Sequence, residues 1–267
     1  RQRQMCIRDR DINSDKMYSF IEKKRNEGLS NRYIGDIIVL MKSVFKYAVK
    51  TYCIYNPMEG VSLPRKKTSD IRLLDKKEQL CLEEYVSKIH NSTTLGITLA
   101  MTTGIRIGEL CALQWKDIDL EKRILTVSKT VQRIQLHEAD RKTKLIITEP
   151  KSESSKRIIP IPEAVVAFLK EMRENDEDFV VSGTSRVIEP RTMQYRFAKI
   201  LKNVNLPSVH FHALRHMFAS NCIRLGFDIK ALSEILGHSS VEITLNRYVH
   251  SSFEQKTEYM NRITICV

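Results

Sequence analysis

The stretch from Phe211 to Tyr248 reads FHALRHMFASNCIRLGFDIKALSEILGHSSVEITLNRY and predicts three short consecutive helices. A helical pattern covers residues 212–225, 228–236 and 241–248. Glycine at position 237 is a typical helix end, and the two serines after His238 can cap the helix that follows. This part of the chain therefore belongs to a mainly helical domain.

His212 and Arg215 stand three residues apart in the first of these helices, so both are expected on one face. A face that carries an imidazole and a guanidinium suits an anion. A pair at this spacing is common on helix surfaces, however, and taken alone it is better interpreted as a surface pair without function.

Three more residues could act on an anion or as a nucleophile. Arg106 directly precedes a short helix in TGIRIGEL, where free backbone N–H groups favour negative charge, and its planar fork matches two phosphate oxygens. Taken alone, Arg106 is better explained as an ion-pair partner of Glu109. His238 stands at a helix junction, and Tyr248 is one of nine tyrosines. None of these residues is specific by itself.

Outward from this stretch, the N-terminal part predicts a small helical domain over residues 11–64. A helix over 14–27 ends before Gly28, and a second runs to about Tyr52 with apolar residues at three- and four-residue spacing, which we interpret as core. Residues 65–72 predict a linker, because helix-breaking residues precede a basic triplet there. That triplet either contacts a polyanion or is simply solvated.

Residues 73–250 predict a larger domain in which helices flank a few strands. Three short segments rich in β-branched residues predict one small antiparallel sheet: 123–130, 143–149 and 156–161. Residues 179–181 predict one more short strand. The predicted fold class is mainly α with a small antiparallel β-sheet.

Composition limits the classes of function. The 44 Lys and Arg residues against 32 Asp and Glu residues give a formal charge of +12, which favours a polyanionic partner such as nucleic acid. We expect a soluble protein, because no apolar run approaches the length of a membrane span, and a cytoplasmic one, because the scattered cysteines are typical of a reducing compartment. The six cysteines form no metal-binding pattern and are interpreted as free thiols, with Cys111 and Cys222 as core residues.

Taken in order, the motifs resemble the tyrosine recombinase (phage integrase) family. TGIRIGEL matches the family's first arginine, HALRH its HxxR, LGHSS its second histidine and NRYVH its nucleophile. The family's lysine lies in a turn of the small sheet, where Lys151 and Lys156 both stand, and Lys151 fits the Pro-Lys-Ser pattern better. The resemblance covers residues 75–250 well, and residues 11–64 look like the latter part of the family's helical core-binding domain.

The resemblance implies a metal- and ATP-independent DNA strand transferase that forms a 3′-phosphotyrosyl intermediate. Tyr248 is the implied nucleophile, Arg106 and Arg215 clamp the phosphate, and His238 is a further donor. His212 is our candidate base for the phenol proton, and Lys151 our candidate acid for the leaving oxygen. No cofactor is expected. The implied partners are double-stranded DNA recombination sites and three further copies of the chain, with an excisionase or a DNA-bending protein as an accessory.

Two ends of the chain are treated separately. Residues 1–10 are expected to be non-native, because residues 5–10 match the translation of a transposon end used in sequencing libraries, so the natural start is expected to be missing. Residues 251–267 are expected to form a tail that docks on a neighbouring protomer and regulates Tyr248, as the family's C-terminal segments do.

Within the family, TMQYRFAKIL and NRYVH look more like integrases of phages and conjugative elements than like chromosomal resolvases. We therefore expect integration or excision of a mobile element. A chromosome-dimer resolvase and an inactive DNA-binding remnant stay open as alternatives, and a type IB topoisomerase fits the LGHSS and NRYVH arrangement less well. The sequence does not give the DNA site.

Overall fold

The computed structural model describes residues 12–64, 72–135, 143–150 and 153–248, together with Thr257 and Asn261. The chain divides into two compact units, residues 1–70 and 71–267, and each is described by itself. The predictions made for residues 1–10, for residues 65–71 of the linker, for Lys151 and for the tail as a whole lie outside the described residues.

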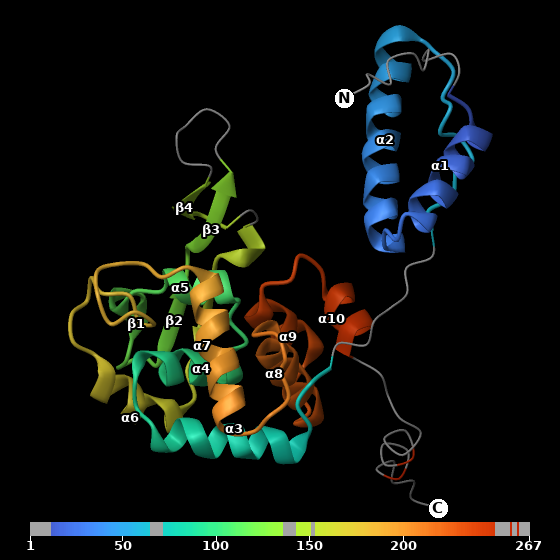
Figure 1. The fold of residues 1–267 in the computed structure, drawn as a ribbon. Coiled ribbons are helices and arrows are strands. Elements are labelled where there is room, and N and C mark those ends of the chain that lie inside the picture. Colours follow the sequence, from blue (N-terminus) through green and yellow to red (C-terminus); the bar gives the residue numbers. More distant parts are fainter. Residues whose placement is uncertain are drawn as a thin grey trace, which may run out of the picture. The chain divides into compact units, whose positions relative to one another are not determined.

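The first unit is a pair of helices, α1 (Ser14–Asn26) and α2 (Asn31–Tyr52), shown in blue in Figure 1. The side chains of Asn13 and Ser30 cap them by accepting the backbone N–H groups of Lys16 and Tyr33. Six buried apolar residues form the core of this unit: Met17, Ile21, Ile34, Ile38, Met58 and Val61. The apolar spacing of α2 is thus a packing stripe, as its sequence indicates.

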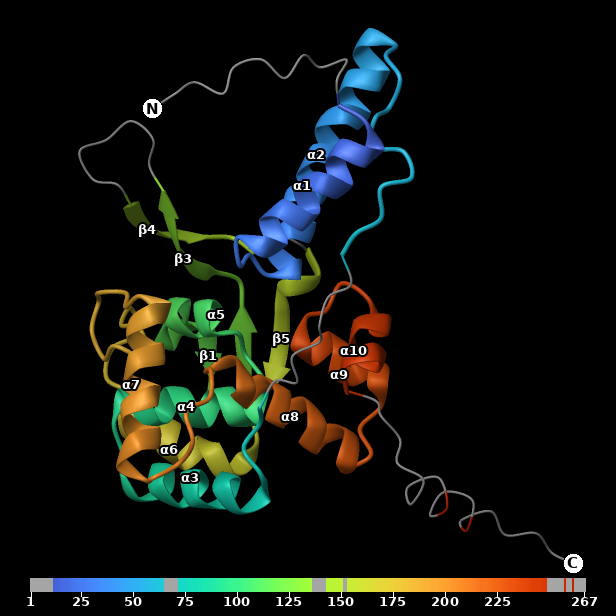
Figure 2. The same ribbon diagram turned by 45° about the vertical axis from the view of Figure 1, so that its right-hand side comes forward.

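The second unit contains eight α-helices within its described residues. Three of them precede the strands and five follow: α3 (Lys76–Lys88), α4 (Ser92–Thr103), α5 (Ile107–Ala112), α6 (Glu163–Met172), α7 (Pro190–Asn203), α8 (His212–Arg224), α9 (Ile229–Leu236) and α10 (Val241–Tyr248). The last three match the predicted segments to within a residue. In both ribbon views they lie together on one side of the unit (Figures 1 and 2).

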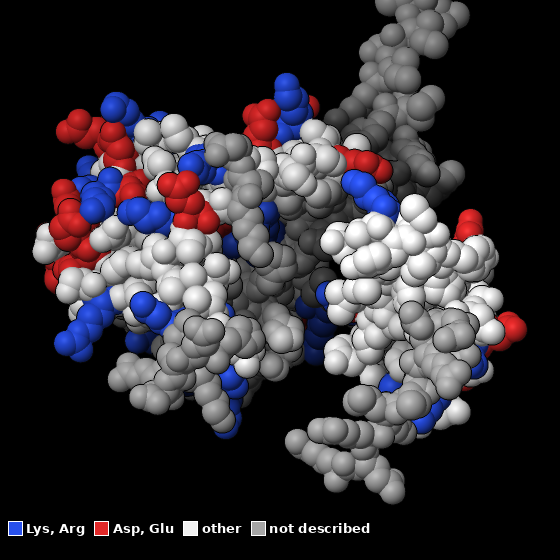
Figure 3. All heavy atoms as spheres, turned by 90° about the horizontal axis from the view of Figure 1, so that it is seen from above, with Lys and Arg blue, Asp and Glu red and all other residues white. Residues whose placement is uncertain are grey.

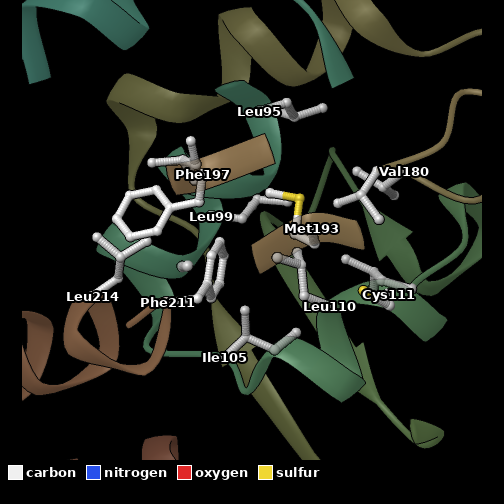
Figure 4. Packing of buried hydrophobic residues seen from close by; sticks show 14 of the residues in the cluster. Leu95, Leu99, Ile105, Leu110, Cys111, Val180, Met193, Phe197, Phe211 and Leu214 are labelled. Atoms are coloured by element: carbon white, nitrogen blue, oxygen red, sulfur yellow. The ribbon is translucent and has the colours of Figure 1, made fainter. Parts of the chain in front are cut away.

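The core of the second unit lies where α4, α5, α7 and the start of α8 meet. Figure 4 shows side chains from these elements pointing at one another, with Phe197 and Phe211 packed edge to face at 5.4 Å between ring centroids. Cys111 belongs to this core, and Cys222 to a smaller cluster between α8 and α9. Both cysteines are therefore buried, as predicted.

The strands form two antiparallel sheets rather than the one that the sequence predicts. The first has the order β1-β2-β5, from Ile118–Asp119, Ile124–Val127 and Arg157–Pro160. The second is a hairpin of β3 (Thr130–Gln135) and β4 (Thr143–Thr148). The sequence missed β3 because only Val131 is buried along it, so the strand carries no apolar alternation. Phe179 forms isolated bridges instead of a strand.

Two glycines with positive φ angles set the path of the chain into the last three helices. Gly104 ends α4 at φ 63°, and Gly237 ends α9 at φ 64°. A Cβ atom on Gly104 would lie 2.5 Å from Cδ1 of Phe218 on α8. The absence of a side chain there lets α8 pack closely against the end of α4, which brings Arg215 of α8 to the turn before Arg106.

Figure 3 shows one face of the molecule, on which Lys and Arg side chains are interspersed with Asp and Glu at the edge of the larger unit. The face seen in this view is therefore of mixed charge. Among the residues that the structure describes, no helix is long and apolar enough to cross a membrane.

Candidate active site

Arg215 is held in the interior of the second unit by two backbone carbonyls. Its side chain lies on α8, is almost fully buried, and donates from Nη1 to the Gly104 oxygen (2.7 Å) and from Nη2 to the Leu236 oxygen (2.6 Å). These bonds join α8 to the end of α4 and to the end of α9. A surface pair of His212 and Arg215 is therefore the wrong interpretation: His212 is exposed at the start of α8, but Arg215 is not.

Arg106 is the residue before α5 and lies at the same place. Its Nη1 donates to Oε1 of Glu109 (2.7 Å) and its Nη2 to the Gly237 oxygen (2.7 Å). The ion pair with Glu109 that the sequence allows is thus present, yet a third of the Arg106 side chain stays exposed. The guanidinium is fixed on one side and open to a ligand on the other.

Arg157, at the start of β5, is a third arginine of the cluster and was not singled out in the sequence. It donates to both carboxylate oxygens of Glu109 (2.9 and 3.2 Å) and from Nε to the Ile235 oxygen (2.6 Å). The sequence did contain a hint of its role. Arg157 is the first residue of a short apolar strand, and an arginine at such a position needs a hydrogen-bond acceptor if its side chain is buried. The sequence could not say which partner.

Glu109 is the carboxylate around which two of these arginines gather, and it is almost fully buried. Burial alone would raise its pKa, but the hydrogen bonds and positive charges of Arg157 and Arg106 outweigh that effect and hold the pKa below its ordinary value. Glu109 also accepts the backbone N–H of Arg106, so it caps α5 (3.1 Å). The cluster therefore has a fixed negative centre.

The positive charges of the three arginines repel one another, and burial and this repulsion both lower the pKa of Arg215. Burial, followed by the positive charges of Arg106 and Arg157, lowers the pKa of Arg215 to about 9. The guanidinium still carries its charge at neutral pH. A phosphate that entered here would relieve this repulsion, so the cluster is suited to bind an anion with two or more oxygens.

His238 follows the last turn of α9 and points toward α10. Its Nδ1 lies 2.8 Å from the hydroxyl oxygen of Thr244, a fully buried residue of α10. This contact orients the imidazole, so that Nε2 is the nitrogen directed away from Thr244. Thr244 was not foreseen from the sequence, where nothing local distinguishes it from other threonines.

Tyr248 ends α10, and its ring packs among histidines. The ring of His216 lies 5.4 Å away and that of His238 lies 6.3 Å away and nearly parallel, measured between centroids. The Tyr248 hydroxyl oxygen is buried. His212 is one ring further out, 4.8 Å from His216. The structure thus brings Tyr248 close to His238. It also brings His216, which the sequence did not single out, into contact with both Tyr248 and His212.

The lysine is the one predicted site residue that cannot be placed. Lys151 lies outside the described residues, whereas Lys156 is described and forms an ion pair with Glu149 (2.8 Å). The choice between the two lysines therefore stays a prediction. Within the described ranges, no group of three or more His, Cys, Asp or Glu residues is arranged to hold a metal ion.

Comparison with known proteins decides the family. The model of the phage integrase family matches residues 72–255. The chain belongs to the phage integrase family. A relative named tyrosine recombinase XerC-like, from Caldanaerobacter subterraneus subsp. tengcongensis, is 30% identical over 92% of this phage integrase chain and 69% of its own length.

Relatives from mobile elements are similar to this chain as well. The transposase from transposon Tn916 of Enterococcus faecalis is 28% identical over 71% of the chain, which spans only 50% of the length of that transposase. A solved structure of the Tn1549 transposon integrase in complex with transposon right end DNA has 25% identity and a TM-score of 0.76, covering 94% of this chain and 85% of the other. The family and fold are therefore shown, and the relatives include both mobile-element and XerC-like proteins.

Proposed function

We propose that this chain is the DNA-cutting and DNA-joining part of a site-specific recombinase, with Tyr248 as its nucleophile. The observation that supports this most directly is the meeting of Arg106, Arg215 and His238 at the end of α9, beside the ring of Tyr248. The phenol oxygen attacks a DNA phosphorus, forms a 3′-phosphotyrosyl bond and releases a 5′-hydroxyl. One phosphodiester is exchanged for another, so rejoining needs no ATP.

Arg106 and Arg215 act on the phosphate. Negative charge gathers on the non-bridging oxygens in the transition state, and preorganised cationic donors there are each worth roughly 3 kcal/mol. Both guanidinium groups are already held by backbone carbonyls, so little reorganisation is needed when DNA arrives. His238, oriented by Thr244, donates a further hydrogen bond to the same phosphate.

Two proton transfers complete the step. The Tyr248 phenol has an ordinary pKa of about 10, so its proton must leave as the bond to phosphorus forms, and the His212 imidazole accepts it. The leaving 5′-oxygen takes a proton from Lys151. Reversal of both transfers rejoins the strand. The His216 ring contacts both the Tyr248 ring and the His212 ring, so replacing His212 and His216 one at a time by glutamine distinguishes the base from a neighbouring histidine.

The partner in this proposal is double-stranded DNA at a recombination site, in the cytoplasm. Solved relatives include a lambda integrase dimer bound to a core site and the Tn1549 transposon integrase with DNA. We propose that residues 11–64 contact DNA as part of a core-binding domain, that four protomers assemble on two sites, and that residues 251–267 dock on a neighbouring protomer. An excisionase or a DNA-bending protein would direct the reaction.

Integration or excision of a mobile element is the proposed role. The support is the similarity to the Tn916 transposase and to the ICEBs1 integrase of Bacillus subtilis, which is 26% identical over 88% of this chain. A chromosomal resolvase is the second candidate, favoured by the XerC-like relative. Flanking genes for excision or conjugation would support the first role.

Covalent capture on DNA of random sequence tests the proposal. The full chain is incubated with a library of duplexes that carry a random segment and a nearby nick, so that the short 5′-hydroxyl product diffuses away. Protein-linked DNA is then recovered under denaturing conditions and sequenced. We expect recovery with the wild type and a loss of at least about a hundredfold with Tyr248→Phe, since the nucleophile is removed.

Two results would contradict the proposal. Equal adduct formation by Tyr248→Phe would show that another group attacks the phosphate. No adduct with either protein, although the library still binds, would favour the inactive DNA-binding remnant.

A further inference from the structure

Three successive backbone carbonyls at the end of α9 each accept a hydrogen bond from a different arginine. Ile235 accepts from Arg157 (2.6 Å), Leu236 from Arg215 (2.6 Å) and Gly237 from Arg106 (2.7 Å). The last carbonyls of a helix lack a partner within that helix, and they lie at the negative end of its dipole. The end of α9 thus serves as an anchor for the whole arginine cluster.

Among the described residues, the Arg157 side chain forms more hydrogen bonds within the protein than that of Arg106 or Arg215 does, four against two each. Only 6% of its side chain is exposed, and four acceptors surround its guanidinium: the oxygens of Ile235 and Ser155 and both carboxylate oxygens of Glu109. Gly237 leaves room for it, since a Cβ atom there would lie 3.0 Å from Cδ and Nη1 of Arg157. All three guanidinium nitrogens of Arg157 therefore donate hydrogen bonds within the protein.

Arg157 and Arg106 meet on the same carboxylate. Glu109 Oε1 accepts from Nη1 of Arg106, and Arg157 binds both oxygens, so Arg157 sets the plane of the carboxylate. That plane in turn sets the direction of the Arg106 guanidinium, whose second anchor is the Gly237 carbonyl. Without Arg157, the carboxylate is free to turn and to bind Arg106 through both oxygens, which would draw its fork away from a ligand.

We infer that Arg157 is a positioning residue of the recombination reaction, which acts through Glu109 and the end of α9 to aim Arg106 at the scissile phosphate. The inference rests on the function proposed above. It also ties the strand that follows the lysine-bearing turn to the arginine clamp, because Arg157 opens β5. Since Arg157 works by direction, its geometry is required and its charge alone does not suffice.

The test compares Arg157→Lys with a matched control, Arg173→Lys. Arg173 also binds a carboxylate and a backbone carbonyl, those of Asp176 and Ile118, but it joins the end of α6 to β1. Each protein is assayed at saturating concentration in a single turnover on a nicked duplex recovered by covalent capture, about 20 °C below its own melting midpoint. DNA affinity is measured separately by fluorescence anisotropy.

For Arg157→Lys we expect DNA affinity within about twofold of the wild type and a cleavage rate lower by about tenfold or more, because small misplacement of a clamp is costly. Arg173→Lys should cleave at the wild-type rate. If Arg157 acts through Glu109, Arg157→Lys combined with Glu109→Gln should cleave about as slowly as the slower single variant, whereas independent effects would multiply.

Several outcomes would overturn the inference. Wild-type cleavage by Arg157→Lys, or effects that multiply in the double variant, would remove Arg157 from the clamp while leaving the proposed function intact. Loss of a cooperative melting transition in Arg157→Lys would show that the residue is needed for the fold itself. Failure of the wild type to form any adduct would instead remove the proposed function, and the inference with it.

Discussion

At the residue scale, the three arginines of the candidate site differ in exposure although all of them bind the end of α9. Arg106 is a third exposed, whereas Arg157 and Arg215 are buried. An exposed guanidinium held at two points can meet a phosphate without losing much side-chain freedom, since its orientation is already fixed. Arg106 is therefore the residue at which fork geometry should matter most for cleavage.

Arg106→Lys should bind DNA within about threefold of the wild type but cleave it at least about a hundredfold more slowly, because the charge is kept while the planar fork is lost. Anisotropy gives the binding constant and single-turnover capture gives the rate. Equal rates for the two proteins would remove Arg106 from the phosphate clamp.

Glu109 gives a prediction for stability against pH. Its pKa is held below the ordinary value of 4.5, so its contribution is complete above pH 4.5 and is lost as the pH falls through the lower, folded-state value. Glu109→Gln should lower the free energy of unfolding by about 3 kcal/mol at pH 7, as expected when a buried ion pair loses one partner. The gap between wild type and variant should narrow below pH 4.5.

Denaturant unfolding at a series of pH values from neutral down to about one unit below the ordinary carboxyl pKa measures that gap. A constant difference across the series would mean that Glu109 is not ionised in the folded protein, and the carboxylate would then not be the negative centre of the cluster.

Five residues of the candidate site were singled out from the sequence because their motifs occur in the family's order, not because any one of them is specific. The helix ends next to them also have clear signals, such as Gly104 and Gly237. The five residues are Arg106, His212, Arg215, His238 and Tyr248. Arg157, His216 and Thr244 could not be found in this way, because their importance comes from contacts between separate segments. Arg157 and Glu109 stand 48 positions apart, and no local pattern links them.

At the scale of elements, the turn between α4 and α5 controls the geometry of the cluster. Gly104 adopts φ 63°, its oxygen accepts from Arg215, and a Cβ atom there would lie 2.5 Å from Phe218 and 2.9 Å from Leu236. Helices could be predicted here because their apolar spacing is regular, and β4 was predicted as well. Strand β3 was missed, because only Val131 is buried along it.

Gly104→Ala should destabilise the second unit by about 3 kcal/mol, from about 1 kcal/mol of left-handed backbone strain and a larger cost of displacing α8. Gly226→Ala is the matched control, since Gly226 has φ 80° but no atom within 4 Å of where a Cβ would stand. Gly226→Ala should lower the free energy of unfolding only by the backbone strain, about 1 kcal/mol. Thermal melting compares the two variants, and equal losses would mean that α8 does not pack closely on this turn.

At the scale of the whole molecule, the two units should protect their cysteines differently. Burial raises the pKa of Cys111 to about 12 and that of Cys222 to about 11, whereas Cys53 is exposed at the end of α2. Thiolate is the reactive form, so buried thiols with raised pKa values react slowly.

Brief treatment with iodoacetamide at mildly alkaline pH should therefore modify Cys53 and leave Cys111 and Cys222 unmodified until denaturant unfolds the second unit. Peptide mass spectrometry identifies each modified site. Modification of Cys111 as fast as Cys53 under native conditions would contradict the packing of α5 into the core.

The central claim is that Tyr248 becomes covalently joined to DNA, and mapping the attachment site tests it most directly. After capture and nuclease trimming, cleavage at lysine releases residues 231–256, a peptide whose single tyrosine is Tyr248. We predict a nucleotide remnant on that peptide, located at Tyr248 by fragmentation. A remnant on any other peptide would contradict the claim.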